Sequence, residues 1–173
     1  IANHGVGPVF GTGAAAAVMI GISEDRISDL LTYCAQQASG SWQWLMDVEH
    51  IEKSFVFAGM GARNGVTAAI MAQMGFSGVW DVLDGEHNAL IALSTDPNPE
   101  EMVAGLGSRF FVAETAIKPF SVGYPIQAPL DAFLRLHREH GLRADDVARI
   151  VVRLPQDGAR VVNDRAMPDV NCQ

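Results

Sequence analysis

Residues 49–65 combine the side chains best suited to binding a small, multiply charged anion. Lys53 is followed by two phenylalanines, and Arg63 and Asn64 stand at the start of an apolar, alanine-rich segment. A helix N-terminus attracts anions through its free N–H groups, and a lysine offers a carboxylate a compact positive charge. Two alternatives stay open: a surface ion pair between Lys53 and Glu49, four residues earlier, and ordinary helix capping around Asn64.

Other polar residues lie next to turns. Lys118 ends a predicted strand and enters the loop at 119–125, a common position for functional side chains. His4 and His50 lie beside glycine-rich or charged turns, and their context leaves open either a role in a site or an ordinary place at the surface or in the core. No histidine pair has metal-ligand spacing, so we expect no metal site.

A dinucleotide-binding turn is a second interpretation of the stretch around Lys53. Gly59-x-Gly61-x-x-Asn64-Gly65 follows the strand-like run at 55–57 and is followed by two aspartates, Asp81 and Asp84. The third glycine comes one position late, however, and no strand–helix–strand unit follows. The sequence also has no Gly-x-Ser-x-Gly elbow, so nucleophilic hydrolysis is not indicated.

Composition limits the class of protein. The chain has 173 residues, 49% of them hydrophobic, which is enough for a core of one domain or two small ones. Its net charge of −8 argues against nucleic-acid binding, and no apolar run is long enough for a membrane span. Its two cysteines, Cys34 and Cys172, lie far apart, which favours a reducing, cytoplasmic location, with a single disulfide as the alternative.

Residues 1–95 are predicted to be helical. The alanine-rich run at 11–21 favours close helix packing, and Ser23 is a suitable N-cap for a helix that ends near Gly40. A further helix is expected over 62–74, with Gly75 as its stop.

Residues 96–173 have a different pattern, after a proline-rich turn. A short helix is predicted over 100–106, a strand over 109–117, an amphipathic helix over 126–141 and a strand over 150–154. The expected fold is therefore mainly α plus α+β: part of an all-helical domain at 1–95, then a small, incomplete α+β domain at 96–173.

The order of these motifs resembles the MmgE/PrpD family. The resemblance lies in Glu52-Lys53-Ser54-Phe55-x-x-Ala58-Gly59-x-x-Ala62-Arg63-Asn64-Gly65 and in Ile117-Lys118-Pro119-Phe120. Upstream, His4 and the run Gly11-Thr12-Gly13-Ala14 are similar to a histidine and a helix start of the same family. Members are much longer and pair a large helical domain with an α+β lid, so the resemblance implies an internal fragment of such a chain.

The resemblance also implies which residues form the site. Lys53 and Lys118 match two active-site lysines, and His4 matches a histidine that lines the same cleft, while Arg63 and Asn64 would support the Lys53 segment. Where the lid motif of other members carries a cysteine or histidine, this chain has Gly123 and Gln127, and the neighbouring Tyr124 is a possible substitute. We therefore expect Lys53, Lys118 and His4 to be catalytic, and Arg63, Asn64, Tyr124 and Gln127 to bind substrate.

The function implied by this resemblance is a cofactor-free lyase or isomerase, such as a 2-methylcitrate dehydratase, that acts on a small di- or tricarboxylate. It would abstract a proton α to a carboxylate. The alternative is a catalytically degenerate protein of the same fold that binds carboxylates or serves in assembly. Exposed apolar helix faces predict contact with the rest of a longer chain or with a second copy in a homodimer.

Overall fold

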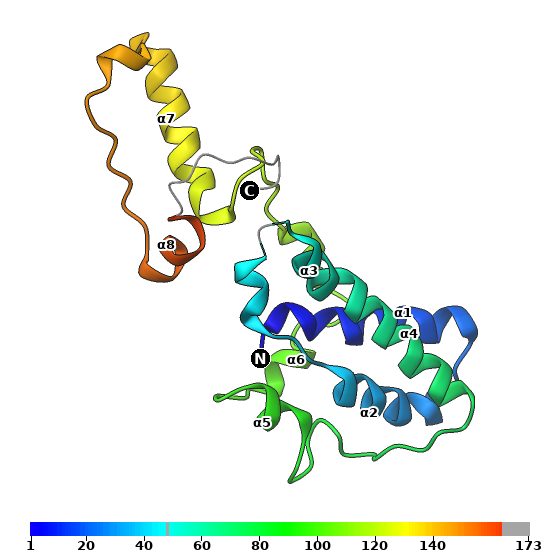
Figure 1. The fold of residues 1–173 in the computed structure, drawn as a ribbon. Helices are drawn as coiled ribbons and strands as arrows, with labels where there is room; N and C mark the ends of the chain where they lie inside the picture. The colour runs from blue at the N-terminus through cyan, green and yellow to red at the C-terminus, as the bar shows by residue number, and fades with distance from the viewer. Residues whose placement is uncertain (48, 164–173) are drawn as a thin grey trace. The chain divides into compact units, whose positions relative to one another are not determined.

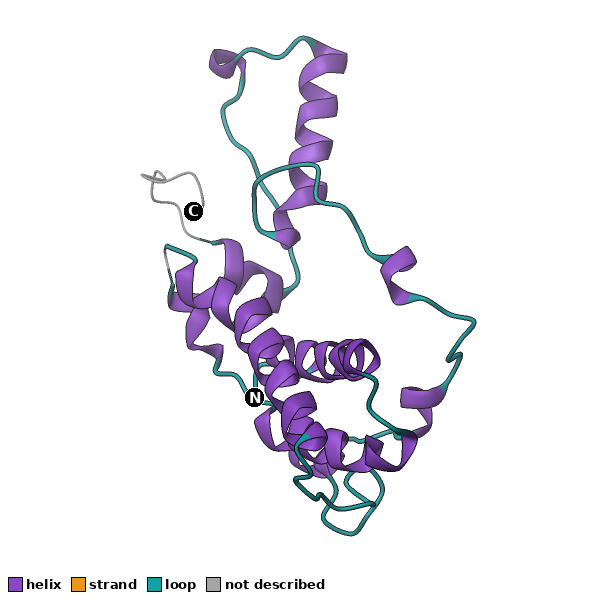
Figure 2. Cartoon of the chain, turned by 90° about the vertical axis from the view of Figure 1, so that its right-hand side faces the viewer, coloured by secondary structure: helices purple, strands orange, loops and turns teal. Residues whose placement is uncertain are grey.

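A computed structural model describes residues 1–47 and 49–163. The chain divides into two compact units, Ile1–Phe110 and Phe111–Gln173, and each is considered by itself. Helices joined by loops make up both units, and no residue of the described ranges lies in a β-strand (Figure 2). Within the same ranges, no helix has the combination of length and hydropathy that a membrane span needs.

The first unit is built mainly from α-helices. Its α-helices are α1 Gly7–Ile20, α2 Ile27–Gln37, α3 Ile51–Ser54, α4 Met60–Gln73, α5 Ala89–Leu93 and α6 Glu100–Val103. Short 3-10 helices, η1 Asn3–Gly5, η2 Glu24–Arg26 and η3 Trp42–Met46, precede α1, α2 and α3, and a π-helical turn, η4 Phe55–Gly59, joins α3 to α4.

The core of this unit is the crossing of α1, α2 and α4 (Figure 1). Small residues allow close approach: a Cβ added to Gly65 would lie 2.5 Å from the carbonyl oxygen of Val9 and 2.6 Å from the amide nitrogen of Gly13. Alanines on α1 and α4 and larger side chains on α1 and α2 fill the space around the crossing. The buried members are Val9, Ala17, Leu30, Cys34, Ala68, Ala69 and Ala72.

The helices predicted for this unit are confirmed. The alanine-rich run lies in α1, the helix after Ser23 is η2 continued by α2, and the helix expected over 62–74 is α4. Gly75 follows the end of α4 with a φ of +92°, a left-handed conformation that costs a glycine little. Helix α2 ends at Gln37, earlier than expected from Gly40.

The structure corrects the prediction of a strand-like run at 55–57. These residues form the π-helical turn η4, and Gly59 and Gly61 lie inside helical backbone rather than in a turn after a strand. The run is too short to pair by itself, and it is continuous with helical residues on both sides. Since the dinucleotide fingerprint needs a strand and a glycine turn before its helix, that interpretation was wrong.

The second unit contains η5 Phe111–Glu114, η6 Tyr124–Ile126, α7 Gln127–His140, η7 Ala144–Asp146 and α8 Gln156–Val162. The amphipathic helix expected over 126–141 is α7, and Gly141 follows it in a left-handed conformation. Helix α8 packs against η6, where a Cβ on Gly158 would lie 3.2 Å from the Pro125 side chain.

The structure also corrects the prediction of two strands, at 109–117 and 150–154. Residues 109–117 contain the 3-10 turn η5 and otherwise loop, and residues 150–154 are also loop. An alternating apolar segment becomes a strand only when a second segment supplies hydrogen-bond partners, and no such ladder forms within 1–47 and 49–163. The helical part of the expected fold is confirmed, whereas the sheet of the α+β part is not seen.

Candidate active site in the helical unit

His4 lies in an aromatic environment at the start of α1. Its ring stacks on Phe57, with centroids 4.3 Å apart and an interplanar angle of 2°. Its edge contacts are with Trp42 at 5.8 Å and with Trp44 at 5.5 Å. His4 lies in η1 and Phe57 lies in η4, whereas both tryptophans lie in η3. Three separate segments of the chain therefore meet here.

Lys53 belongs to the same cluster. Its Nζ atom lies 5.6 Å from the ring centroid of Trp44 and 5.8 Å from that of Phe57, within the range of cation–π attraction. We call His4, Trp42, Trp44, Phe57 and Lys53 the aromatic cluster. It unites an imidazole and an ammonium group, both predicted as catalytic, against the same aromatic rings.

The backbone around Lys53 is held by local hydrogen bonds. The Lys53 N–H donates to Oδ2 of Asp47 at 2.9 Å, and Ser54 Oγ donates to the carbonyl of His50 at 2.7 Å. His50 itself has a φ of +59°, which non-glycine residues adopt rarely. The first turn of α3, which carries Lys53, is therefore fixed by the segment before it.

Arg63 and Asn64 support this region through protein contacts. The Arg63 Nε and Nη2 atoms donate to Oδ1 of Asn64 at 3.1 and 3.0 Å, and the guanidinium lies 5.6 Å from the ring centroid of Phe55. Asn64 is buried and donates to the carbonyl of Gln37 at 3.0 Å. The bond between Asn64 and Gln37 ties α4 to α2, and substrate binding by Arg63 or Asn64 stays a prediction.

The predicted lid residues lie in the second unit. Lys118 and Tyr124 are exposed, at the two ends of a loop. The Gln127 side chain closes this loop: its Oε1 accepts from the N–H of Phe120 at 3.2 Å, and its Nε2 donates to the carbonyls of Phe120 and Val122. A Cβ on Gly123 would lie 2.7 Å from Cγ1 of Val162, so α8 occupies the space beside that glycine.

The structure thus brings His4 and Lys53 together and places Arg63 and Asn64 on the adjoining helix. Sequence reasoning missed Trp42, Trp44 and Asp47 as members or supports of this site. The available signal was a pair of tryptophans, spaced Trp-x-Trp, directly before the charged stretch. Tryptophans in a small charged region are candidates for a binding surface.

Cys34 takes no part in this arrangement. It is 1% exposed in the α1–α2–α4 core, its Sγ lies 3.7 Å from the carbonyl oxygen of Val9, and burial raises the pKa of its thiol to about 11. Among the described residues, no group of three or more His, Cys, Asp or Glu side chains has the geometry to hold a metal ion.

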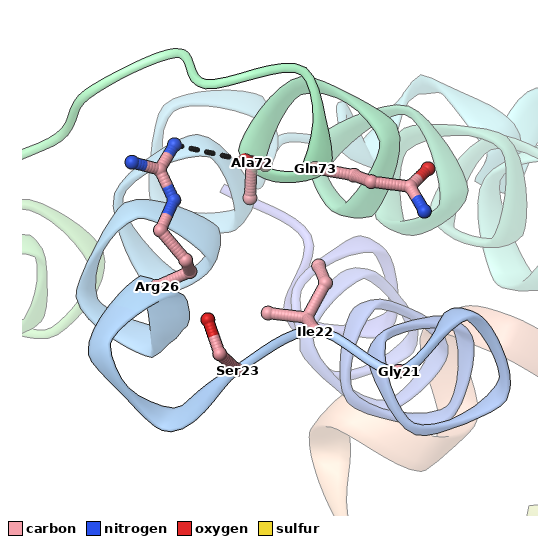
Figure 3. A pocket seen from close by; sticks show the side chains of 6 residues that line it. All are labelled: Gly21, Ile22, Ser23, Arg26, Ala72 and Gln73. Carbon is pink, nitrogen blue, oxygen red and sulfur yellow. Dashed lines mark hydrogen bonds between the residues drawn. The ribbon is translucent and has the colours of Figure 1, made fainter.

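A cavity of about 240 Å³ lies where α1 and α4 both end (Figure 3). Within it, Arg26 Nη2 donates to the carbonyl of Ala72 at 2.8 Å, and its Nε pairs with Asp29 at 3.0 Å. This guanidinium caps the C-terminus of α4, which is a structural role. The lining residues are Gly21, Ile22, Ser23, Arg26, Ala72 and Gln73.

A second cavity, of about 430 Å³, lies on another part of the unit and does not involve the aromatic cluster. It is mainly apolar, with one carboxylate. Its lining residues are Leu31, Trp80, Val82, Leu83, Asp84, Pro99, Met102 and Val103.

The helical unit therefore places a histidine and a lysine against the same aromatic rings. The sequence profile of the MmgE/PrpD N-terminal domain matches residues 1–102, which lie within the first unit. The chain therefore belongs to the MmgE/PrpD family.

Curated relatives agree with this membership. The chain is 26% identical over 167 residues to the cis-aconitate decarboxylase-like protein oryM of Aspergillus oryzae, which covers 87% of this chain and 34% of the relative. It is 27% identical over 146 residues to a cis-aconitate decarboxylase of Aspergillus terreus, covering 78% of this chain and 29% of the relative. The chain spans about a third of the length of these relatives.

Proposed function

We propose that the protein is a lyase or isomerase that acts on a small di- or tricarboxylate by removing a proton α to a carboxylate. The observation that carries this proposal is the meeting of His4 and Lys53 on Phe57 and Trp44. The two relatives named for cis-aconitate decarboxylation support a carboxylate as substrate.

The chemistry needs a cation and a base. A proton next to a carboxylate is weakly acidic, because its removal places a second negative charge on the carboxylate oxygens. An ammonium such as that of Lys53 would hold the carboxylate and stabilise this developing charge. The imidazole of His4 or the second lysine, Lys118, would take or return the proton. Loss of a β-hydroxyl as water completes an elimination, whereas return of the proton to the opposite face completes an epimerisation.

The test is a turnover assay of the intact protein, with citrate-like hydroxy acids and cis-aconitate as substrates. We expect Lys53→Ala to lower kcat/KM by at least about a hundredfold, since it removes the charge that stabilises the transition state. Unchanged turnover would remove Lys53 from the mechanism.

Two further variants sharpen this test. Lys53→Arg keeps a positive charge but cannot lose a proton, so partial activity assigns Lys53 to carboxylate binding and none assigns it to proton transfer. Arg135→Ala is the matched control, because Arg135 pairs only with Asp131 on the exposed face of α7 among the contacts seen here. It removes one cation at the surface, and turnover should stay at the wild-type level.

A carboxylate-binding protein without activity is the second candidate. The observation that favours it is the state of the predicted lid positions: Gly123 has no side chain, and the Gln127 amide is engaged by backbone groups of Phe120 and Val122. Neither offers an acid or a base. Thermal stabilisation of the intact protein by several carboxylates, with turnover of none, would favour this candidate.

A further inference from the structure

The indole nitrogen of Trp44 has no hydrogen-bond partner. Trp44 is 7% exposed, and within residues 1–47 and 49–163 its Nε1 is the one buried side-chain nitrogen or oxygen for which no acceptor or donor is found. Native structures pair nearly all such groups, so a buried N–H without an acceptor calls for a physical explanation. A ligand that brings its own acceptor is one.

The position of this indole is what makes a ligand the better explanation. Its ring centroid lies 5.6 Å from Nζ of Lys53, 5.5 Å from the His4 ring and 4.8 Å from the Phe57 ring. A carboxylate has two acceptor oxygens, each of which takes a hydrogen bond of roughly 2.9 Å from nitrogen. The 5.6 Å distance runs from Nζ to the ring centroid, and Nε1 is an atom of that ring, so the two oxygens of one carboxylate are suited to join the ammonium and the N–H.

We propose that Trp44 is a ligand-binding residue whose indole N–H donates a hydrogen bond to the same carboxylate that pairs with Lys53. This inference rests on the proposed function, because it takes the ligand to be a carboxylate. Lys53 supplies charge and Trp44 supplies direction, since an indole has a single N–H with a fixed orientation in its ring plane. Together they would fix both oxygens of one carboxylate.

The proposed binding includes a movement of Trp42. The N–H is covered in the structure, so a ligand reaches it only when a neighbour moves. Trp42 contacts Trp44 at 5.7 Å, but it is 48% exposed, and its ring can turn toward solvent without opening a buried core. Displacement of this ring would cost little compared with displacement of a buried one.

The experiment compares Trp44→Phe with the wild type in the intact protein. Phenylalanine keeps an aromatic ring and removes the N–H. The probe is tricarballylate, a tricarboxylate without a leaving group, whose Kd is measured by calorimetry. We expect Trp44→Phe to raise this Kd about tenfold, the usual effect of losing a hydrogen bond to a charged acceptor, while the protein stays folded with a modest loss of thermal stability from the smaller buried ring.

A spectroscopic measurement separates binding from packing. In protein labelled with ¹⁵N at the indole, saturation with tricarballylate should shift the Trp44 N–H proton resonance downfield, and Trp44→Phe assigns that resonance by its disappearance. Trp80 provides an internal control, since it is 81% exposed and lines a cavity that does not include the aromatic cluster. Its resonance should not move.

Trp80→Phe is the matched control variant and should bind tricarballylate within about twofold of the wild type, because Trp80 is 81% exposed and lies outside the aromatic cluster. Equal affinity of Trp44→Phe and wild type, with binding still lost in Lys53→Ala, would overturn the role of Trp44 and leave the proposed function standing. Absence of tricarballylate binding in the wild type would overturn this inference as well, while the turnover assay decides the proposed function separately.

Discussion

At the scale of single residues, the aromatic cluster depends on contacts between side chains far apart in the sequence. His4 precedes α1, whereas Phe57 lies in the π-helical turn before α4, and their rings stack at 4.3 Å. Lys53 is useful in this setting because it is a cation held beside aromatic faces, where a bound carboxylate would be partly removed from water. The same lysine on an open helix surface would be an ordinary surface charge.

Cys34 leads to a prediction about reactivity. Its thiol is buried, and its pKa is raised to about 11, so in the folded protein near pH 8 it is neutral and shielded. In a Cys172→Ser background, iodoacetamide should leave Cys34 unmodified at pH 8 and modify it fully in urea, as measured by peptide mass spectrometry. Rapid modification without denaturant would contradict the packing of the α1–α2–α4 core.

The same cysteine predicts a pH dependence of stability. An unfolded cysteine ionises near pH 8.5, whereas the folded Cys34 thiol has the higher pKa, about 11. The buried neutral thiol therefore contributes fully to the free energy of unfolding below about pH 8.5. This contribution is lost as pH rises from about 8.5 through about 11, by roughly 3 kcal/mol in total. Urea unfolding should show a loss of the free energy of unfolding between about pH 8 and about pH 10.5 that Cys34→Ala lacks. An equal change in both proteins would contradict the prediction.

At the scale of elements, the fold depends on how closely α1 and α4 can approach. Gly65 lies where backbone atoms of α1 would contact any added carbon. The glycines of the stretch around Lys53 suggested a dinucleotide-binding turn, but Gly61 and Gly65 lie where α4 approaches the backbone of α1. Glycine patterns therefore have two physical causes, and only the position of the neighbouring backbone distinguishes them.

This close approach is directly testable. Gly65→Ala would place Cβ 2.5 Å from the carbonyl oxygen of Val9, and since both atoms are held by helical backbone, the helices must separate. We expect a loss of about 3 kcal/mol in the free energy of unfolding. Gly11→Ala is the matched control, because its added Cβ meets nothing within 4 Å and alanine favours a helix, so stability should stay equal or rise by up to about 1 kcal/mol. Equal effects of the two substitutions on thermal unfolding would refute the account.

At the scale of the whole molecule, large apolar side chains remain on the surface. Val18 and Met19 at the end of α1 are 83% and 86% exposed, and Trp80 is 81% exposed. The chain spans about a third of the length of its curated relatives, so such surfaces are suited to contact with further protein.

We therefore predict that residues 1–173, produced alone, self-associate. Sedimentation velocity over a dilution series should show species larger than a monomer, because burial of apolar area favours association. The double variant Val18→Glu, Met19→Glu should shift the distribution toward the monomer. A single monomeric species for the wild-type segment at every concentration would contradict the prediction.

The sequence by itself determined the longer helices of this protein. Local signals were sufficient for α1, α2, α4 and α7, because helical periodicity, a suitable first turn and a glycine at the stop all act within a few residues. Family motifs also singled out Lys53 and His4, although nothing in the sequence places them against the same aromatic rings.

Only the tertiary structure decided which of these residues share a site and what the ambiguous segments become. The apolar runs at 55–57, 109–117 and 150–154 suggested strands, but a strand needs a partner from elsewhere in the chain, and without one the first joined a helix and the others formed turns and loop. The aromatic cluster and the unpaired N–H of Trp44 likewise arise from packing between segments distant in sequence. Local patterns fix what neighbouring residues do, whereas chemistry between distant residues depends on how the helices pack.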